Sequence, residues 1–227
     1  MSLVILSDTK GNLIEAHQLR LEMPLLGTWT AHLETTADTA IDGNVVITIQ
    51  HGDEAAERFV GTVVDGEPYE GRAPLVVVGG TEGLSKRPAK ASYYVGANSA
   101  IEVAQLVGDV LVEADEVPSD ATALSGLRAS AWARLETESH ARALTRIAER
   151  FDIGWRVFAS GAVWAGPVEW LDADLEGEEL DVDTDARIVS IRYRVASARP
   201  GTTIGGRRIS LVVFTADGLG ELHYEAM

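Results

Sequence analysis

The sequence predicts an α+β protein that is mainly β, with its helices confined to the middle of the chain. Three observations lead to this fold class. The first third of the chain contains short apolar or alternating segments separated by turn signals. Two stretches in the middle have apolar residues at helical spacing. After a run of acids, three more strand-like segments follow, at residues 187–195, 207–214 and 219–224.

The N-terminal part is predicted to be an antiparallel β unit. Leu19, Leu21 and Met23 alternate with polar residues, as in a strand that buries one face. Residues 45–49 form a β-branched run, which also favours a strand. Short strands separated by regular turn signals are typical of a barrel or a sandwich. We place this unit at residues 1–88.

The middle part, residues 89–171, is predicted to be an α+β subdomain. Ser99 and Glu102 have the spacing of a capping box, which predicts a helix near residues 99–114. A second amphipathic helix is predicted near residues 139–151.

A tryptophan-marked hairpin is predicted directly after the second helix. Asp152-Ile153-Gly154 breaks the helical pattern, and residues 155–165 contain two short strand-like runs around a turn. Trp155 and Trp164 lie on either side of this turn, so we expect them to pair across the two strands.

Residues 172–186 are predicted to be an exposed acidic loop, because they contain eight acids and no base. Residues 181–185 have the alternating aspartates that open an EF-hand loop. The sixth and twelfth positions of such a loop, however, are Ala186 and Arg192 here, instead of Gly and Glu. A solvated loop is therefore favoured over a calcium contact. The C-terminal β unit follows at residues 187–227 and is expected to pack with or complete a second barrel.

The composition excludes several classes of protein. Among 227 residues, 35 acids face 19 bases, which gives a net charge of −16. Sequence-independent binding to nucleic acids and to anionic membranes is therefore disfavoured. The absence of cysteine excludes disulfides and thiolate metal sites. The N-terminus resembles no secretory signal, and we expect a soluble chain without a membrane span.

No sequence motif indicates catalysis, a metal or a cofactor. The five histidines lack any metal-binding spacing, and surface or interface positions are expected for each. Residues 78–86 are rich in glycine, but Lys86 follows Ser85 instead of preceding it, so a phosphate loop is not predicted. We therefore predict no catalytic, cofactor-binding or metal-binding residues, no cofactor and no enzymatic activity.

Two alternatives stay open on these residues alone. Four tryptophans (Trp29, Trp155, Trp164 and Trp170) are candidates for the sugar-stacking face of a carbohydrate-binding β module, although strand tryptophans more commonly belong to a core or an interface. A hydrolase with an unmarked pair of carboxylates is the other alternative, because the chain has many acids.

Several segments resemble the hub proteins of contractile phage tail baseplates, the family that includes late-control protein D and the hub part of type VI secretion spike proteins. The similarity includes Trp132–Leu135 before the second helix, and the hairpin segments Ile153–Val157 and Gly161–Gly166 after it. Met23–Ala31 and Arg199–Ser210 resemble the opening of shorter hub-like chains and the connection into the second hub barrel. The chain carries no segment similar to a needle or a lysozyme extension.

The resemblance implies a structural role. Family hubs are trimers in which each subunit supplies two tube-type β units, so that the ring is pseudo-sixfold and joins the hexameric tail tube to the trimeric spike. The expected partners are further copies of this chain, the tail tube protein, the spike protein and the baseplate wedge proteins, while DNA passes through the channel without specific binding. The expected location is a virion tail baseplate, or a contractile injection particle, assembled in the bacterial cytoplasm.

Overall fold

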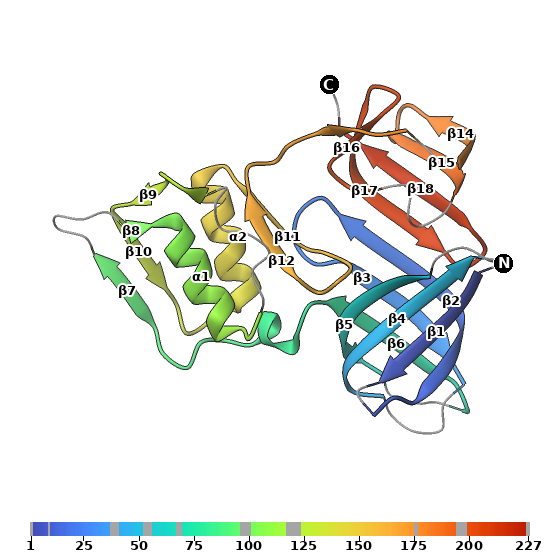
Figure 1. Ribbon diagram of the computed structural model, residues 1–227, viewed down its shortest axis with the longest axis horizontal. Coiled ribbons are helices and arrows are strands. Elements are labelled where there is room, and N and C mark those ends of the chain that lie inside the picture. Colours follow the sequence, from blue (N-terminus) through green and yellow to red (C-terminus); the bar gives the residue numbers. More distant parts are fainter. Residues whose placement is uncertain are drawn as a thin grey trace. The chain divides into compact units, whose positions relative to one another are not determined.

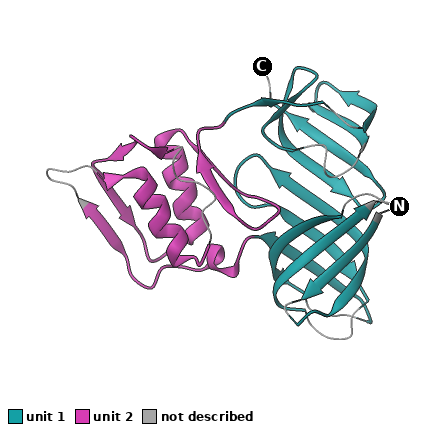
Figure 2. Cartoon of the chain, viewed as in Figure 1, with its two compact units in different colours: residues 1–79, 169–227 teal, residues 80–168 magenta. Residues whose placement is uncertain are grey.

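The computed structural model describes residues 2–8, 10–36, 41–51, 56–66, 70–95, 101–116, 124–174, 177–193 and 199–225. The chain forms two compact units, drawn in different colours in Figure 2. Unit 1 combines Met1–Gly79 with Glu169–Met227, and unit 2 is Gly80–Val168. The predicted fold class is confirmed, because the structure is mainly β and its α-helices lie in the middle of the chain.

Six antiparallel strands of unit 1 close into a barrel (Figure 1). Around the barrel the strand order is β1-β4-β5-β6-β3-β2, and the pairing of β2 with β1 closes the ring. Closure removes the open edges that a flat sheet would expose. The strands are β1 (Ser2–Asp8), β2 (Leu13–Pro24), β3 (Thr30–Thr35), β4 (Gly43–His51), β5 (Glu57–Asp65) and β6 (Ala73–Gly79).

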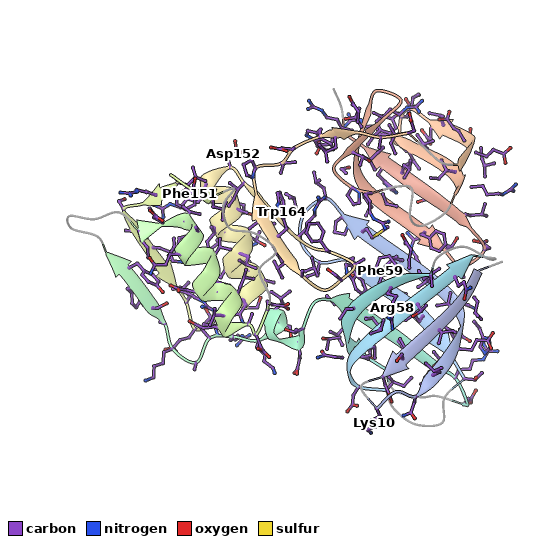
Figure 3. The ribbon with its side chains drawn as sticks, viewed as in Figure 1. Lys10, Arg58, Phe59, Phe151, Asp152 and Trp164 are labelled. Carbon is purple, nitrogen blue, oxygen red and sulfur yellow. The ribbon has the colours of Figure 1, made fainter. Side chains whose placement is uncertain are left out.

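Apolar side chains fill the interior of the barrel. On β4 the buried residues Val45, Ile47 and Ile49 alternate with less buried ones, as expected for a strand with one face toward a core. Phe59 of β5 is labelled in Figure 3. Trp29, which precedes β3, packs edge-on against it, with 5.6 Å between the ring centroids. The barrel therefore has a solid core that is centred on aromatic rings.

Two glycines make room for the Trp29 ring. Gly61 of β5 and Gly79 of β6 are cross-strand partners. A Cβ atom on Gly61 would lie 2.7 Å from Trp29 Cη2, and one on Gly79 would lie 2.6 Å from Trp29 Cε2. The Gly79 amide also donates to the Trp29 carbonyl oxygen at 2.9 Å. A side chain at either glycine would collide with the indole ring.

The long strand β2 connects the barrel to a second antiparallel sheet. The N-terminal part of β2 pairs with β1, and residues 20–24 pair with β17 (Arg207–Thr215). The sheet then continues through β18 (Leu219–Tyr224) and β15 (Ile188–Tyr193) to β14 (Gly177–Asp183). Two short strands, β13 (Leu171–Asp172) and β16 (Thr202–Ile204), join it through β17.

The structure differs from the predicted acidic loop at residues 172–186, because Gly177–Asp183 form strand β14. A tight turn connects β14 to β15, and the Asp183 side chain accepts hydrogen bonds from the amides of Asp185 and Ala186 at 3.0 and 2.8 Å. Six of the seven residues of β14 are exposed. Leu180 and Val182 alternate with Asp181 and Asp183, but this alternation is short and lies within a run of acids, so the sequence pattern resembles that of a loop.

Unit 2 contains two helices that pack against each other, α1 (Val103–Glu113) and α2 (His140–Phe151). Each helix buries an apolar face, formed on α1 by Val103, Leu106, Val107, Val110 and Leu111. The smaller elements of the unit are η1 (Glu82–Ser85), β7 (Ser92–Val95), β8 (Ile101–Glu102), β9 (Arg128–Ala129), β10 (Ala131–Arg134), β11 (Gly154–Val157) and β12 (Val163–Gly166).

Helix α1 begins at Val103, four residues after the start that the capping-box pattern predicts. Glu102 is the N-cap residue, with extended backbone and no side-chain hydrogen bond to the helix. It also pairs with Arg128 in the β8–β9 ribbon. The capping box requires Glu102 to be the third residue of the helix, but Glu102 is paired in a strand. The predicted capping box is therefore wrong. Ser99 lies outside the described residues.

Helix α2 agrees with its prediction at both ends. The Ser139 hydroxyl accepts a hydrogen bond from the Arg142 amide at 3.2 Å and caps the first turn. Asp152 ends the helix in the left-handed conformation, with φ 52° (Figure 3). The β11–β12 hairpin follows directly.

Trp155 and Trp164 do not pair across this hairpin. Trp155 is opposite Ala165, and Trp164 is opposite Arg156. Because successive side chains of a strand point to opposite faces, this register places the two tryptophans on different faces of the hairpin. Trp155 is buried, whereas Trp164 is half-buried.

Among the described residues, the structure contains no helix that is both long enough and apolar enough to cross a membrane.

Candidate functional site

Two of the segments that resemble hub proteins lie side by side in unit 1. Pro24 pairs with Leu211, and the Leu25 amide donates to the Ser210 carbonyl oxygen at 2.7 Å. The segment that starts at Met23 therefore runs from the second sheet to Trp29 in the barrel core. These contacts form a junction that fixes the second sheet to the barrel.

The segment at 199–210 crosses the same junction. Arg199 Nη2 contacts Glu57 Oε1 on β5 at 2.7 Å, so it binds the connection to a barrel strand. The Thr202 hydroxyl donates to the Arg199 carbonyl oxygen at 2.7 Å, which stabilises the Pro-Gly-Thr turn. Gly205 and Gly206 have positive φ values and form the hairpin turn from β16 to β17.

The tryptophan-containing segments of unit 2 pack on helix α2. The Arg146 guanidinium lies 4.6 Å from the Trp132 ring centroid and 3.1 Å from Glu138 Oε1. Trp155 Nε1 donates to Thr145 Oγ1 on α2 at 3.2 Å. These contacts are those of a packed core.

An ionic cluster lies between α1, α2 and β10, in which Arg134 and His140 are buried and Glu113 is exposed. Arg134 Nη1 is 2.8 Å from Glu113 Oε2, and His140 Nε2 is 3.8 Å from the same oxygen. His140 Nδ1 donates to the Gly83 carbonyl oxygen at 2.7 Å. The expectation of a surface or interface position is wrong for His140, which is buried. The hydrogen bond from Nδ1 offsets part of the cost of burying this polar ring.

Glu116 is a buried acid of unit 2. Its Oε1 accepts a hydrogen bond from the Thr81 amide at 2.6 Å and lies 2.9 Å from the Thr81 hydroxyl. Burial raises the pKa of Glu116 above the ordinary value of a glutamate, and the hydrogen bonds from Thr81 oppose this shift. Glu116 and Thr81 thus connect the end of α1 to the start of η1.

The glycine-rich stretch at 78–86 forms the end of β6 and the 3-10 helix η1. Lys86 contacts Glu82 at 3.1 Å on the surface. The described part of the chain contains no group of three or more histidine, aspartate or glutamate side chains placed to hold a metal ion.

The four tryptophans do not form one stacking face. Trp29 and Trp155 are buried in the cores of different units. Trp164 and Trp170 are half-buried, and arginines cover their rings at centroid distances of 5.2 and 5.4 Å. The carbohydrate-binding alternative therefore loses the observation on which it rested.

One face of the second sheet is polar and contains a hollow of about 350 Å³. Acidic and hydroxyl side chains line it together with apolar ones, among them Leu180, Ser190, Val213, Asp217, Leu219 and Glu221. Leu180 and Leu219 are 44% and 40% exposed, which is high for leucine. Sequence reasoning missed this hollow because it depends on the pairing of β14 with β15.

No family model matches the sequence, and no curated protein matches it either. The fold, however, is similar to that of phage tail proteins. A tail protein of prophage MuSo2 from Shewanella oneidensis superposes with a TM-score of 0.65 at 11% identity, over 98% of this chain and 97% of that chain. A tail protein from Neisseria meningitidis MC58 superposes with a TM-score of 0.63 at 12% identity, over 99% of this chain and 96% of that chain.

A third similar structure comes from a secretion system. The E. coli c3393 protein is described as a component of the type VI secretion system with structural similarity to the T4 phage tail proteins gp27 and gp5. It superposes with a TM-score of 0.58 at 10% identity, over 94% of this chain and 74% of that chain. The resemblance to phage tail proteins is thus confirmed at the level of the fold, over nearly the whole chain.

Proposed function

We propose that this chain is a non-enzymatic, structural component of a phage-like contractile tail, namely the baseplate hub protein that joins the tail tube to the central spike. The observation that carries the proposal is the similarity of fold, along almost the full length, to two phage tail proteins and to a type VI secretion component. The solid barrel core and the packed tryptophans agree with a building-block role.

In the proposed assembly three copies form a ring. Each copy contributes the β1–β6 barrel and the second sheet as two tube-type β parts, which gives the ring six parts. The joint at β2 supports this arrangement, because one strand belongs to both parts and holds them in a fixed register. Such a ring matches a sixfold tube on one side and a threefold spike on the other.

The distribution of charge supports a channel through which DNA passes without adhering. Of the 35 acids, 24 belong to unit 1, against 10 of the 19 bases, whereas unit 2 has 11 acids and 9 bases. The excess of negative charge is therefore concentrated in the β parts that would surround the channel. Acidic walls repel phosphates and leave a passing duplex unbound.

A binding experiment tests the proposal. The purified chain is mixed with the tail tube protein and the spike protein encoded beside it, separately and together. We expect one complex that contains all three proteins, with three copies of this chain. A chain that binds neither partner, or that turns over a glycan, would contradict the proposal. In the finished particle the chain would lie in the baseplate, after assembly in the bacterial cytoplasm with wedge proteins around it.

A further inference from the structure

Strand β14 has one open edge and two exposed faces. It pairs with β15, and no other strand lies beside it in the described part of the chain. An open edge exposes unpaired amide and carbonyl groups, and these are satisfied when a strand of another molecule adds to the sheet. Four of the seven residues of β14 are acids (Glu178, Glu179, Asp181 and Asp183). Glu178 and Glu179 are ion-paired with Arg192 and Arg207 of the same chain. The charge available to a partner strand is therefore that of Asp181 and Asp183, and it favours a partner strand with positive charge.

Strand β7 of unit 2 has the complementary properties. Among the described residues its only neighbouring strand is β10. The segment that leads into β7 contains the exposed bases Lys86, Arg87 and Lys90. The strand itself, Ser92–Val95, has no charged residue that would keep other strands away.

The side chains of β7 also indicate a partner. Tyr94 points into unit 2, where its hydroxyl donates to Asp109 Oδ2 at 2.9 Å. Tyr93 points the other way and is 68% exposed. An exposed tyrosine beside an open edge is typical of an interface anchor, because it brings a large apolar ring and a polar hydroxyl.

We propose that β7 of one copy of this chain adds, antiparallel, to the open edge of β14 in another copy. In this arrangement Tyr93 is opposite Leu180, the residue that the β14–β15 register skips at a bulge and that lines the hollow on the polar face of the second sheet. Strands in a sheet are about 4.8 Å apart, so the tyrosine ring extends over β14 toward the hollow. Leu180 and Leu219 contact the ring there, while Asp217 and Glu221 are the acceptors available to its hydroxyl.

The same register accounts for the charges. Counted antiparallel from Tyr93 and Leu180, Lys90 is opposite Asp183 and close to Asp181. Arg87 and Lys86 are then opposite residues 186 and 187, which follow the turn at Asp185. A head-to-tail contact of this kind, between different surfaces on identical copies, closes into a ring when the rotation between copies permits. The inference rests on the proposed function only in requiring a second copy.

Cysteine cross-linking tests the strand pairing, since the chain contains no cysteine of its own. Two single variants, Leu180→Cys and Tyr93→Cys, are mixed and oxidised. We expect a disulfide-linked dimer to form about tenfold or more faster than in control mixtures, because contact raises the effective concentration of the thiols. The controls pair Leu180→Cys with Val112→Cys on α1 (76% exposed in the wild type), and Tyr93→Cys with Leu13→Cys on β2 (72% exposed).

Charge variants test the polar part of the contact. Asp181→Lys and Lys90→Glu, each made in both cysteine-bearing chains, should lower the cross-linking rate severalfold, and the two together should restore it. Cross-linking at the control rate would overturn the strand pairing, whether or not the wild-type chain forms trimers. If the wild type still forms trimers in that case, the proposed ring stands and is held by other surfaces.

Discussion

Trp29 lies in the barrel core, and its ring fits there because two residues on neighbouring strands are glycines. Gly61 and Gly79 face each other on neighbouring strands, and both contact the indole. Sequence reasoning predicted an antiparallel β unit over residues 1–88, but not this relation. It depends on the register between β5 and β6, which no local pattern encodes.

The fit around Trp29 leads to a stability prediction. Gly79→Ala should lower the free energy of unfolding by about 1–3 kcal/mol, because the added methyl group overlaps the indole ring in a core that cannot expand freely. Urea unfolding followed by tryptophan fluorescence measures the change. Gly108→Ala is the matched control, since a Cβ there meets no atom within 4 Å. In the middle of α1 this change should stabilise by about 0.5–1 kcal/mol. Equal effects of the two substitutions would disprove the described fit.

Glu116 provides a prediction on pH. Burial raises its pKa in the folded state. In the pH range between the unfolded and the folded pKa, the folded chain therefore binds more protons than the unfolded chain. The stability contributed by this group is thus present at low pH and is lost as the pH rises through the folded pKa. Glu116→Gln keeps an oxygen acceptor for the Thr81 amide but cannot ionise.

We expect the Glu116→Gln variant to gain stability relative to the wild type as the pH rises from about 4 to about 7. Urea unfolding of both proteins at several pH values measures this difference and cancels the contributions of the other acids. A difference that does not change with pH, or that decreases, would show that Glu116 ionises as it does in water.

At the scale of elements, prediction succeeded where the pattern was local. The helix at 139–151 and the break at Asp152 follow from the Ser139 cap and the apolar spacing, and both are found. Prediction failed where the structure depends on strand pairing between residues far apart in the sequence. Glu102 joins β9 instead of a helical turn. The acids of β14 form a strand because β15 supplies hydrogen-bonding partners along its length.

The β11–β12 hairpin shows the same limit. Its position could be predicted from the sequence, but the pairing of Trp155 with Trp164 was wrong, because the register puts Ala165 opposite Trp155. Trp155 therefore packs on α2, and Trp164 belongs to the other face with Arg156. Register depends on the turn length, which the residue pattern left undetermined.

The two tryptophans should respond differently to truncation. Trp155→Ala should cost about 3–5 kcal/mol of stability, because a buried ring and its hydrogen bond to Thr145 are lost. Trp164→Ala should cost less than about 2 kcal/mol, because that ring keeps part of its surface in water. Thermal and urea unfolding measure both values. A Trp164→Ala chain with nearly normal stability that no longer assembles would identify Trp164 as an interface anchor.

At the scale of the whole molecule, the site that we propose is a set of assembly surfaces, and sequence motifs describe such surfaces poorly. The family-like segments proved to be packing features of the junction, the helices and the hairpin. The surfaces proposed for assembly, the open edge of β14 and the hollow beside it, carry no motif. They arise from the topology, since the barrel closes its own edges, while β14 ends the second sheet among the strands that the structure describes.

Electron microscopy of assembled particles tests the central claim most directly. A tag on this chain, fused at a terminus, marks its position in images of intact tails. The account predicts three copies in a ring at the junction of tube and spike. A position along the tail tube, a copy number of six, or absence from the particle would contradict the proposed hub.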